Sequence, residues 1–284
     1  MGLKDLLVHI DDIGGNETRL RLAVELARRH DAHLTGLFII ESIDFAVMTA
    51  PAGPDVAALA SLEAFQEEHR AARRALADRL GGAFHSAAER AGIAAEWRVA
   101  EGDAAEVAIL NARYADLAIL GQPDPERPSL GKPPPEAVLL GSGRPILVVP
   151  YIGGNDIIGR HALVAWNASR EAARALNDAL PLLDEAENVT VLSVNPDRGI
   201  SGEGDLPAAD IALHLARHGI KAEASYIVAE DIGIGDALLS RAADLGSDLV
   251  VMGGYGHSRL REIALGGATR TLLRSMTVPV LLSH

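Results

Sequence analysis

The chain has 284 residues, of which 48% are hydrophobic and 23% are charged, and its formal net charge is −13. This length suggests about two domains. A surface this acidic, without a basic run, argues against binding a polyanion such as duplex DNA. The absence of cysteine excludes disulfides, thiolate catalysis and cysteine–zinc sites.

The N-terminus runs directly into a strand pattern at Leu6–Asp11, with no charged segment, apolar stretch and cleavage site before it. We therefore expect no secretory signal. No run of about 18 apolar residues occurs, so we expect no membrane-spanning helix. These features predict a cytoplasmic protein that has neither a nucleic acid nor a membrane among its partners.

After this first strand, the apolar spacing in Glu17–His30 predicts an amphipathic helix, and Ala32–Ile40 predicts a second strand. A loop at Ser42–Asp55 then leads into a long helical stretch that ends at about Ala91. We expect Gly81 and Gly82 to interrupt this helix, because glycine disfavours helical backbone. The equivalent part of the second half, Asn195–Gly219, is much shorter, so the first half carries extra material that is available to cover a cleft or an interface.

Two apolar runs complete the first half. Asp116–Gly121 has an acid before it and a glycine after it, and Arg144–Pro150 closes the half. Short apolar runs of this kind are typical of strands buried on both faces of a parallel sheet. A glycine-containing linker, Tyr151–Arg160, follows them.

The second half repeats the same patterns in the same order. A predicted helix spans Arg170–Leu183, and Pro181 is expected to kink or break its last turn. The predicted strands are Leu163–Asn167, Val189–Val194, Asp248–Gly253 and Val278–His284.

Alternation of strands and helices predicts an α/β fold in which each unit is a five-stranded parallel sheet with helices on both faces. The expected boundaries are residues 1–150 for the first unit, 151–160 for the linker and 161–284 for the second unit. We expect the closing strands, Pro145–Val149 and Pro279–Leu282, to join the units as a pseudo-dimer, because such pairing removes two exposed apolar edges.

The richest chemical signal is the glycine-rich segment Gly253–Thr269, which leads from a strand into a predicted helix. Glycine allows the backbone to turn sharply and to approach a ligand closely. The free amides at a helix N-terminus bind anions, with the helix dipole behind them. Thr269 adds a hydroxyl in the first turn. This segment therefore predicts a phosphate site without a lysine, and a tight connector without a ligand is the alternative.

The spacing Gly253-x2-Gly256-x9-Gly266 resembles the nucleotide loop of the universal stress protein family, and the two tandem strand frameworks extend this resemblance over nearly the whole chain. It implies two flavodoxin-like units with ATP bound at the carboxyl ends of the strands. The ligand is then ATP, with or without magnesium, or another adenine nucleotide, and the role is regulatory in a stress response. The residues implied for this site are Ala165, Asn167, Val194, Met252, Gly253, Tyr255, Gly256, His257, Gly266, Gly267, Ala268 and Thr269.

Two positions of the second unit depart from the family pattern. Asn167 stands where the family has an acidic residue that helps to place the adenosine. Gly267 stands where the family has Ser or Thr, so that hydroxyl is lost and we expect reduced affinity for a triphosphate. Thr269 keeps a hydroxyl two positions further on.

The first unit departs further, although Asp11 matches the acidic position of the family. Gly121 is followed by Gln122-Pro-Asp-Pro125, which lacks a second glycine and places the charge of Asp124 where a phosphate would lie. The entry to the next helix, Gly131–Glu136, contains three prolines, which have no amide donors. We expect this unit to keep the fold and to lack the phosphate site.

Several other side chains have both an ordinary and a chemical interpretation. Asp12 or Asn16 is expected to cap the first helix. His214 and His218 lie four residues apart, as in a metal chelate, but no third ligand is evident, and a solvated helix face is favoured. We therefore predict no metal site. His257 is either a phosphate contact or an exposed loop residue.

No catalytic residue is predicted, and we expect no robust hydrolysis. Two alternatives remain beside the regulatory nucleotide binder. The first is an interaction scaffold that needs no nucleotide, and the second is a slow hydrolase in which His257 is the candidate base. The expected partners are the nucleotide, an unidentified protein and, because the family dimerises through its last strand, a second copy of the chain.

Overall fold

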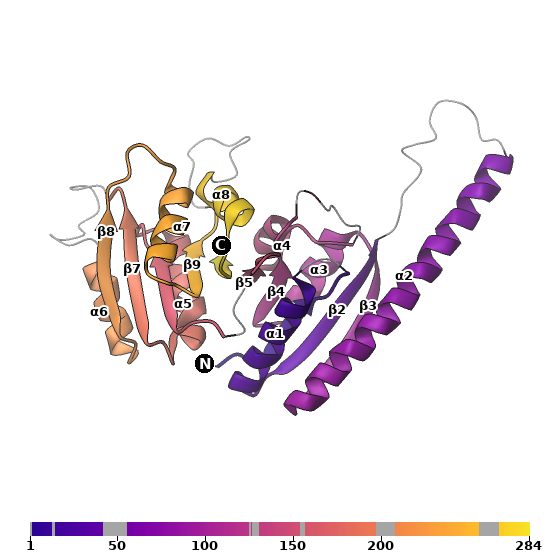
Figure 1. Cartoon of the computed structure of the whole chain (residues 1–284), viewed down its shortest axis with the longest axis horizontal. Coiled ribbons are helices and arrows are strands. Elements are labelled where there is room, and N and C mark those ends of the chain that lie inside the picture. The colour runs from indigo at the N-terminus through magenta and orange to yellow at the C-terminus, as the bar shows by residue number, and fades with distance from the viewer. Residues whose placement is uncertain are drawn as a thin grey trace.

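The computed structural model describes residues 2–12, 15–41, 56–124, 126, 131–153, 157–196, 208–255 and 267–284, with side chains from residue 64 onward in the long helix. The loop expected at 42–55 lies outside these residues. The half of the chain from β1 to β5 is called the first unit, and the half from β6 to β10 the second unit (Figure 1).

The elements of the first unit are β1 (Asp5–His9), α1 (Asn16–His30), β2 (His33–Glu41), α2 (Val56–Ala91), β3 (Ala95–Gly102), α3 (Ala104–Ala112), β4 (Leu117–Gly121), α4 (Pro135–Ser142) and β5 (Ile146–Val149). Those of the second unit are β6 (His161–Ala165), α5 (Arg170–Leu183), β7 (Asn188–Val194), α6 (Ala209–Arg217), β8 (Ala222–Ile227), α7 (Ile234–Asp244), β9 (Leu249–Gly253), α8 (Gly267–Ser275) and β10 (Val280–Ser283). The strands and helices thus alternate as the sequence predicts.

The strands form one ten-stranded sheet in the order β3-β2-β1-β4-β5-β10-β9-β6-β7-β8. Within each unit the paired strands are parallel, and the order of the first unit, read outward from the centre, repeats in the second. This arrangement confirms the predicted α/β class with two flavodoxin-like units. At the centre, β5 and β10 pair antiparallel, which joins the two parallel halves edge to edge.

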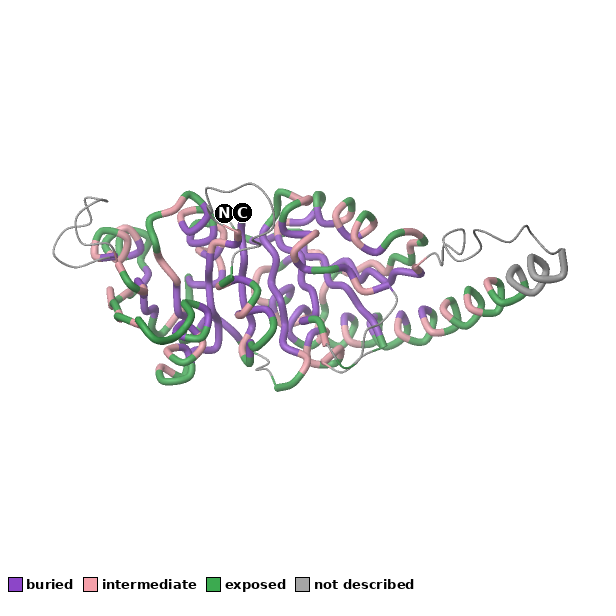
Figure 2. The backbone as a smooth tube through the Cα atoms, turned by 90° about the horizontal axis from the view of Figure 1, so that it is seen from above, coloured by how far each residue is buried: buried purple, intermediate pink, exposed green. Residues whose placement is uncertain are grey.

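Helices cover both faces of the sheet because successive strand residues point to opposite sides and both sides are apolar. One core cluster contains residues of α1, α2, α5 and α6, and the other contains residues of α3, α4, α7 and α8. Each cluster runs through both units. Figure 2 shows the result as a band of buried backbone along the middle of the molecule.

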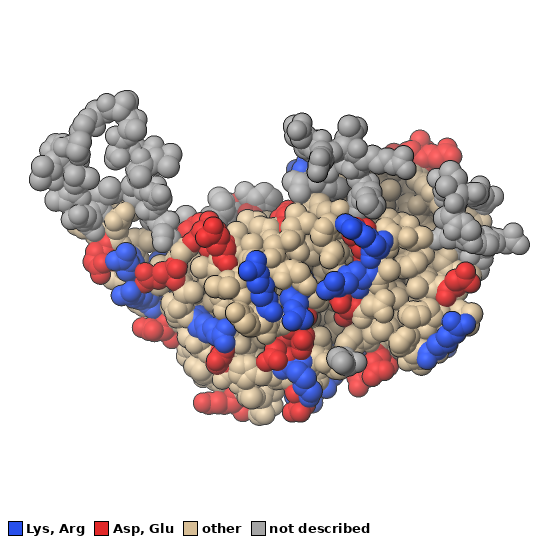
Figure 3. Space-filling view, turned by 180° about the vertical axis from the view of Figure 1, so that it is seen from behind, with Lys and Arg blue, Asp and Glu red and all other residues tan. Residues whose placement is uncertain are grey.

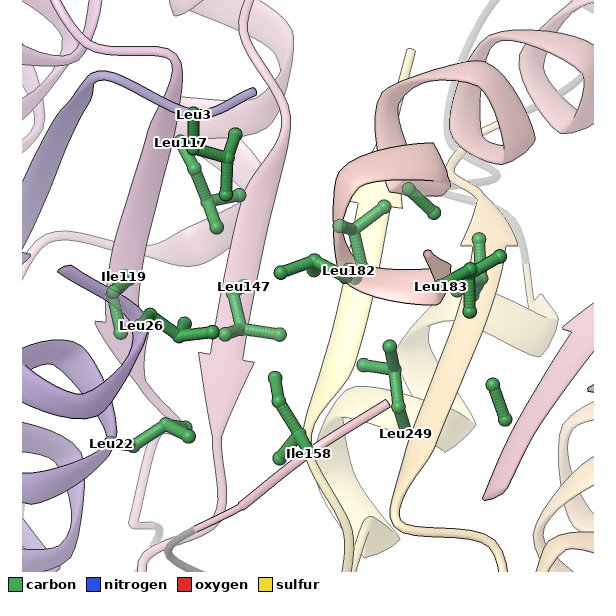
Figure 4. Close-up of a cluster of buried hydrophobic side chains, with 14 of the residues drawn as sticks. Leu3, Leu22, Leu26, Leu117, Ile119, Leu147, Ile158, Leu182, Leu183 and Leu249 are labelled. Atoms are coloured by element: carbon green, nitrogen blue, oxygen red, sulfur yellow. The ribbon is translucent and has the colours of Figure 1, made fainter. Parts of the chain in front are cut away.

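The junction between the units is apolar on both faces. Leu281 of β10 lies opposite Leu147 of β5, and both are fully buried. The linker contributes Ile158, which is 1% exposed and joins the same core cluster. Figure 4 shows Leu147, Ile158 and Leu182 of α5 between the strands of the two units. The closing strands therefore pack together as the sequence predicts.

The acidic residue before each inner strand has the same structural role in the two units. The Asp248 carboxylate accepts hydrogen bonds from the backbone N–H groups of Gly159 (2.7 Å), Arg160 (3.1 Å) and His161 (3.2 Å). In the first unit, Asp116 accepts from the backbone N–H groups of Lys4 (2.8 Å) and Asp5 (3.1 Å). Each carboxylate thus fixes the start of the first strand of its unit against the fourth.

Neither of the two predicted helix breaks is present. α2 is a single helix of 36 residues that continues through Gly81 and Gly82. A Cβ at Gly81 would lie 2.8 Å from Nε1 of Trp97, so this glycine makes room for an indole ring rather than ending the helix. α5 likewise continues past Pro181 to Leu183, because a proline in the last turn removes one hydrogen bond at most.

The extra helix does not cover the junction between the units. α2 packs against α1 and the outer strands β2 and β3, and Figures 1 and 2 show its N-terminal part extending beyond the edge of the sheet. Trp97 of β3 and Phe84 of α2, with ring centroids 5.4 Å apart, anchor its C-terminal half. This helix therefore lies at the edge of the sheet farthest from β10.

Among the described residues, the surface has no broad basic patch on the face seen in Figure 3, as expected from the acidic composition. Acidic and basic side chains are interspersed there. No helix in the described part of the chain combines the length and the apolar character needed to cross a membrane.

The neighbouring glycines of α2 give a matched test of the Trp97 contact. Gly82→Ala should raise the free energy of unfolding by about 0.5–1 kcal/mol, because its Cβ meets no atom within 4 Å and alanine favours the helix. Gly81→Ala should lower it by about 1–2 kcal/mol, because its Cβ would displace the Trp97 ring. Denaturant titration of both variants measures the difference, and equal effects would contradict this account.

The two carboxylate clamps can be compared in the same way. Asp248→Ala should destabilise the chain by about 3 kcal/mol, because it leaves three backbone N–H groups without their acceptor. Asp116→Ala should cost about 1 kcal/mol, because its side chain is 39% exposed and accepts from two such groups. Thermal unfolding monitored by circular dichroism tests this order, and a larger loss for Asp116→Ala would contradict it.

Candidate functional site

The carboxyl ends of β6 and β9 in the second unit, and those of β1 and β4 in the first, are called the crevice of each unit, because sheets of this class bind ligands at that place. The chain leaves β6 toward β7 on one side, whereas β9 and β10 lie on the other side, so the strand order reverses here. Parallel sheets bind ligands at such reversal points. Met252 of β9 belongs to an apolar core cluster, and Ala165 of β6, Val194 of β7 and Tyr255 pack against that cluster. The structure thus brings four of the predicted site residues together.

Gly253 ends β9 directly against the N-terminus of α5. A Cβ at this position would lie 2.5 Å from the backbone N of Ala172 and 2.8 Å from Cβ of Glu171. At Gly254 a Cβ would lie 2.5 Å from Cδ2 of Leu139, which belongs to α4 of the first unit. Gly253 is therefore required by packing against the backbone of α5, whether or not a ligand is bound, whereas a side chain at Gly254 would have to displace the Leu139 side chain.

α8 begins beside the end of β9. Thr269, in its first turn, is 3% exposed, and its Oγ1 accepts a hydrogen bond from the backbone N–H of Tyr255 at 3.4 Å. Tyr255 has a positive φ of 54°, which turns the chain away from the strand. Gly267 is exposed, and a Cβ there would meet no atom within 4 Å. Ala268 is half-buried.

The loop that joins Tyr255 to α8 contains three further predicted site residues. Gly256, His257 and Gly266 lie outside the described residues. Their predicted contacts with phosphate therefore stay predictions.

Asn167 lies at the other side of the crevice, just after β6. It is exposed, and its Oδ1 accepts from the backbone N–H of Ser169 at 3.2 Å. Ser169 in turn caps α5 by accepting from the N–H of Ala172 at 3.1 Å. Asn167 is thus held in a turn at the entrance to the helix, with its side chain open to solvent.

The Tyr255 hydroxyl is part of the boundary between the units. Burial is the main reason that the pKa of this hydroxyl is strongly raised, and the nearby carboxylate of Glu136 from α4 adds to the effect. The oxygen has no hydrogen-bond partner among the described residues. Tyr255 is therefore a neutral phenol at physiological pH, with its ring against the apolar cluster.

The equivalent place in the first unit is filled by a buried polar cluster. Arg19 of α1 is 2% exposed, and its Nε donates to the backbone O of His9 at 2.7 Å. Its Nη2 lies 3.0 Å from Oδ2 of Asp11 and donates to Oδ1 of Asn16 at 3.0 Å. The guanidinium lies directly against Gly121, at the end of β4.

His9 completes this cluster as a neutral side chain. Burial lowers its pKa to about 4, a larger effect than the opposing influence of the Asp11 carboxylate. Its Nε2 lies 3.0 Å from the backbone O of Gly131. The charged pair in the crevice of the first unit is therefore Arg19 with Asp11.

This cluster corrects the expected helix cap. Gly15 with a φ of 86° is the N-cap residue of α1, and no described side chain caps the helix. Asn16 accepts from Arg19 and from the backbone N–H of Asp11 instead, and Asp12 lies 3.7 Å from Nη1 of Arg73. The sequence does carry a signal for Arg19, because it occupies a position on the apolar face of α1, but an arginine there has no unique interpretation.

The structure offers no support for a metal centre within its described part. The rings of His214 and His218 contact each other edge to face, with centroids 4.7 Å apart. No group of three or more His, Asp or Glu side chains among the described residues is arranged to hold a metal ion.

Comparison with known proteins agrees with the fold. The model of the universal stress protein family matches residues 159–284, which include the crevice of the second unit. The universal stress protein Slr1230 of Synechocystis sp. (strain ATCC 27184 / PCC 6803 / Kazusa) is 34% identical over 67 residues, which are 24% of this chain. The match spans 22% of that curated relative.

Solved structures resemble nearly the whole chain. A universal stress protein from Archaeoglobus fulgidus DSM 4304 gives a TM-score of 0.74 at 19% identity, over 98% of this chain and 95% of that one. A putative universal stress protein from Pseudomonas aeruginosa UCBPP-PA14 gives a TM-score of 0.57 at 18% identity, over 99% and 93% of the two chains. At these identities the likeness shows a shared fold. The universal stress protein domain thus covers the second unit, and the whole chain shares its fold with these structures.

Proposed function

We propose that the second unit binds ATP, or another adenine nucleotide, and that this binding serves regulation in a stress response. The observation that carries the proposal is the placement of the buried Thr269 hydroxyl and the N-terminus of α8 beside the end of β9, at the reversal point of the strand order. Amides at such a helix end, with the dipole behind them, favour a phosphate.

The remaining site residues divide by chemistry. Ala165, Val194 and Met252 supply an apolar surface for the adenine side, and Asn167 presents an amide from its turn to the adenosine. The amides of Gly267 and Ala268 would hold phosphate, with those of the preceding loop, and a bound magnesium ion would neutralise phosphate charge. These assignments follow the family resemblance and the positions of the side chains at the crevice.

We propose a single nucleotide site per chain. In the first unit, the Arg19 guanidinium and its partners fill the corresponding end of the crevice. The helix that would offer amides, α4, begins with Pro135 after Pro134, neither of which has a backbone N–H, and the N–H groups of Ala137 and Val138 already donate to the backbone O of Pro134. A phosphate could bind at this end of the first unit only if the buried ion pair of Arg19 and Asp11 were broken, which is strongly unfavourable.

We assign regulation rather than turnover. Glu171, an acidic side chain beside Gly253, is 1% exposed and paired with Arg170, so it is not placed to activate a water. Because β5 and β10 pair within one chain, the edge by which the family dimerises is already used. The tandem chain thus takes the place of a homodimer.

Isothermal titration of the nucleotide-stripped chain with ATP and magnesium tests the proposal. We expect one site per chain, and we expect Gly256→Glu to abolish it because a carboxylate in the loop repels phosphate. Absence of heat and of thermal stabilisation at millimolar ATP would contradict nucleotide binding and favour the scaffold. Two sites would contradict the filled crevice of the first unit.

Restoring the hydroxyl of the family pattern should improve the site. Gly267→Ser should tighten ATP binding by about fivefold to tenfold, because it adds a hydrogen bond to a charged group where the added side chain meets no atom. Gly82→Ser is the matched control, since its Cβ also meets no atom within 4 Å and it lies on α2 of the first unit. Titrations that show no difference between the variants would contradict phosphate binding at α8.

A further inference from the structure

Gln122 of the first unit contacts the far end of the helix to which the proposed function assigns phosphate. It follows β4, and its side chain is buried, with the residue 2% exposed. The side-chain Nε2 donates to the backbone O atoms of Leu273 (3.0 Å) and Arg274 (3.2 Å), in the last turn of α8. Its Oε1 accepts from the backbone N–H of Tyr151 at 3.2 Å. Both ends of the amide are thus bonded.

The position of Gln122 is equivalent to that of Gly254 in the second unit. The backbone N–H of Gln122 donates to Val149 O of β5 at 2.8 Å, and that of Gly254 donates to Ser283 O of β10 at 2.8 Å. A glycine has no side chain with which to return this contact. The contact that Gln122 makes with the last turn of α8 therefore has no counterpart from Gly254.

The contact has a clear physical effect on the helix. The last carbonyls of an α-helix have no partners within the helix, so a donor from outside satisfies them and fixes their position. α8 has nine residues, and a helix of this length is a rigid rod of about 14 Å. Fixing its last turn therefore also fixes its first turn, in which Thr269 lies.

Two further contacts show that the first unit holds this region on both sides. Lys132 Nζ donates to the backbone O of Gln122 at 2.7 Å, which steadies the residue itself. Leu139 of α4 packs against Gly254, where a Cβ would lie 2.5 Å from its Cδ2. The start of the glycine segment and the end of α8 therefore both rest on the first unit.

We propose that Gln122 is a positioning residue for phosphate binding, through which the first unit sets the nucleotide affinity of the second. This inference rests on the proposed function. A helix held in place binds phosphate more tightly than one that must be ordered on binding. The effect is specific to phosphate, because the hydrogen bonds of the Gln122 side chain within the described residues go to α8 and Tyr151, and none goes to the adenosine side of the crevice at Ala165, Val194 and Met252.

The experiment compares ATP with adenosine. In Gln122→Met, a side chain of similar size loses both donors, and in Gln122→Glu a carboxylate faces two carbonyl oxygens. We expect the dissociation constant for ATP to rise about tenfold in the first variant and more in the second, with that for adenosine unchanged within about twofold. Arg174→Ala is the control, because it removes another bond between the units, from Nη2 to Gly143 O at 3.2 Å, away from α8.

Titrations are made well below the melting temperature of each variant, with circular dichroism to confirm folding. If Gln122→Glu does not fold, Gln122→Met still tests the loss of the two hydrogen bonds to α8. If the wild-type chain binds ATP, two results would overturn the positioning role and leave the proposed function intact. One is an unchanged ATP affinity in the Gln122 variants, and the other is an equal loss of affinity for ATP and adenosine. A wild-type chain that binds neither ligand would overturn the proposed function, and this inference with it.

Discussion

Antiparallel pairing of β5 with β10 is the constraint on which the rest of the molecule depends. Each strand ends a parallel half-sheet, and each would expose an apolar edge if the other were absent. The pairing turns two cores into continuous layers, so that α8 of the second unit lies beside β4 and α4 of the first. The contacts of Gln122 and Leu139 with the second unit follow from this junction.

The two units use one fold for different purposes. Beside Gly121, at the end of β4, lies the Arg19 guanidinium, whereas beside Gly253, at the end of β9, lies the backbone of Glu171 and Ala172. The first crevice is therefore closed by a buried ion pair, and the second has a buried threonine hydroxyl at a helix N-terminus. The first unit thus keeps the core of the fold, has a filled crevice and supports the second unit through its contacts.

Much of the fold could be predicted from the sequence, because the strands are short apolar runs and their order repeats. Arg170–Leu183 is predicted to the residue, and the pairing of the closing strands is confirmed. Gly81 and Gly82 mislead because local propensity disfavours a helix, whereas the fit of Trp97 against Gly81 depends on tertiary packing. The sequence predicts an unbroken helix only if that contact is already known.

The candidate site, like the fold, could be predicted from the sequence only in part. Glycines and a threonine at a strand-to-helix junction predict where a phosphate would lie, and the structure places Tyr255 and Thr269 together there. Arg19 and Gln122 could not be assigned, since their roles depend on partners from other elements that no local spacing reveals. For Gln122, those partners are backbone carbonyls more than 150 residues away in the chain.

Hydrogen exchange of the full chain with and without ATP shows whether the nucleotide binds in the second unit alone, because it reports both units at once. We expect slower exchange on ATP binding at the amides of 267–271 and of Gly253–Tyr255, with no change at Gly131–Ser142 in the first unit. Protection in the first unit, or none in the first turn of α8 when ATP is bound, would contradict this expectation.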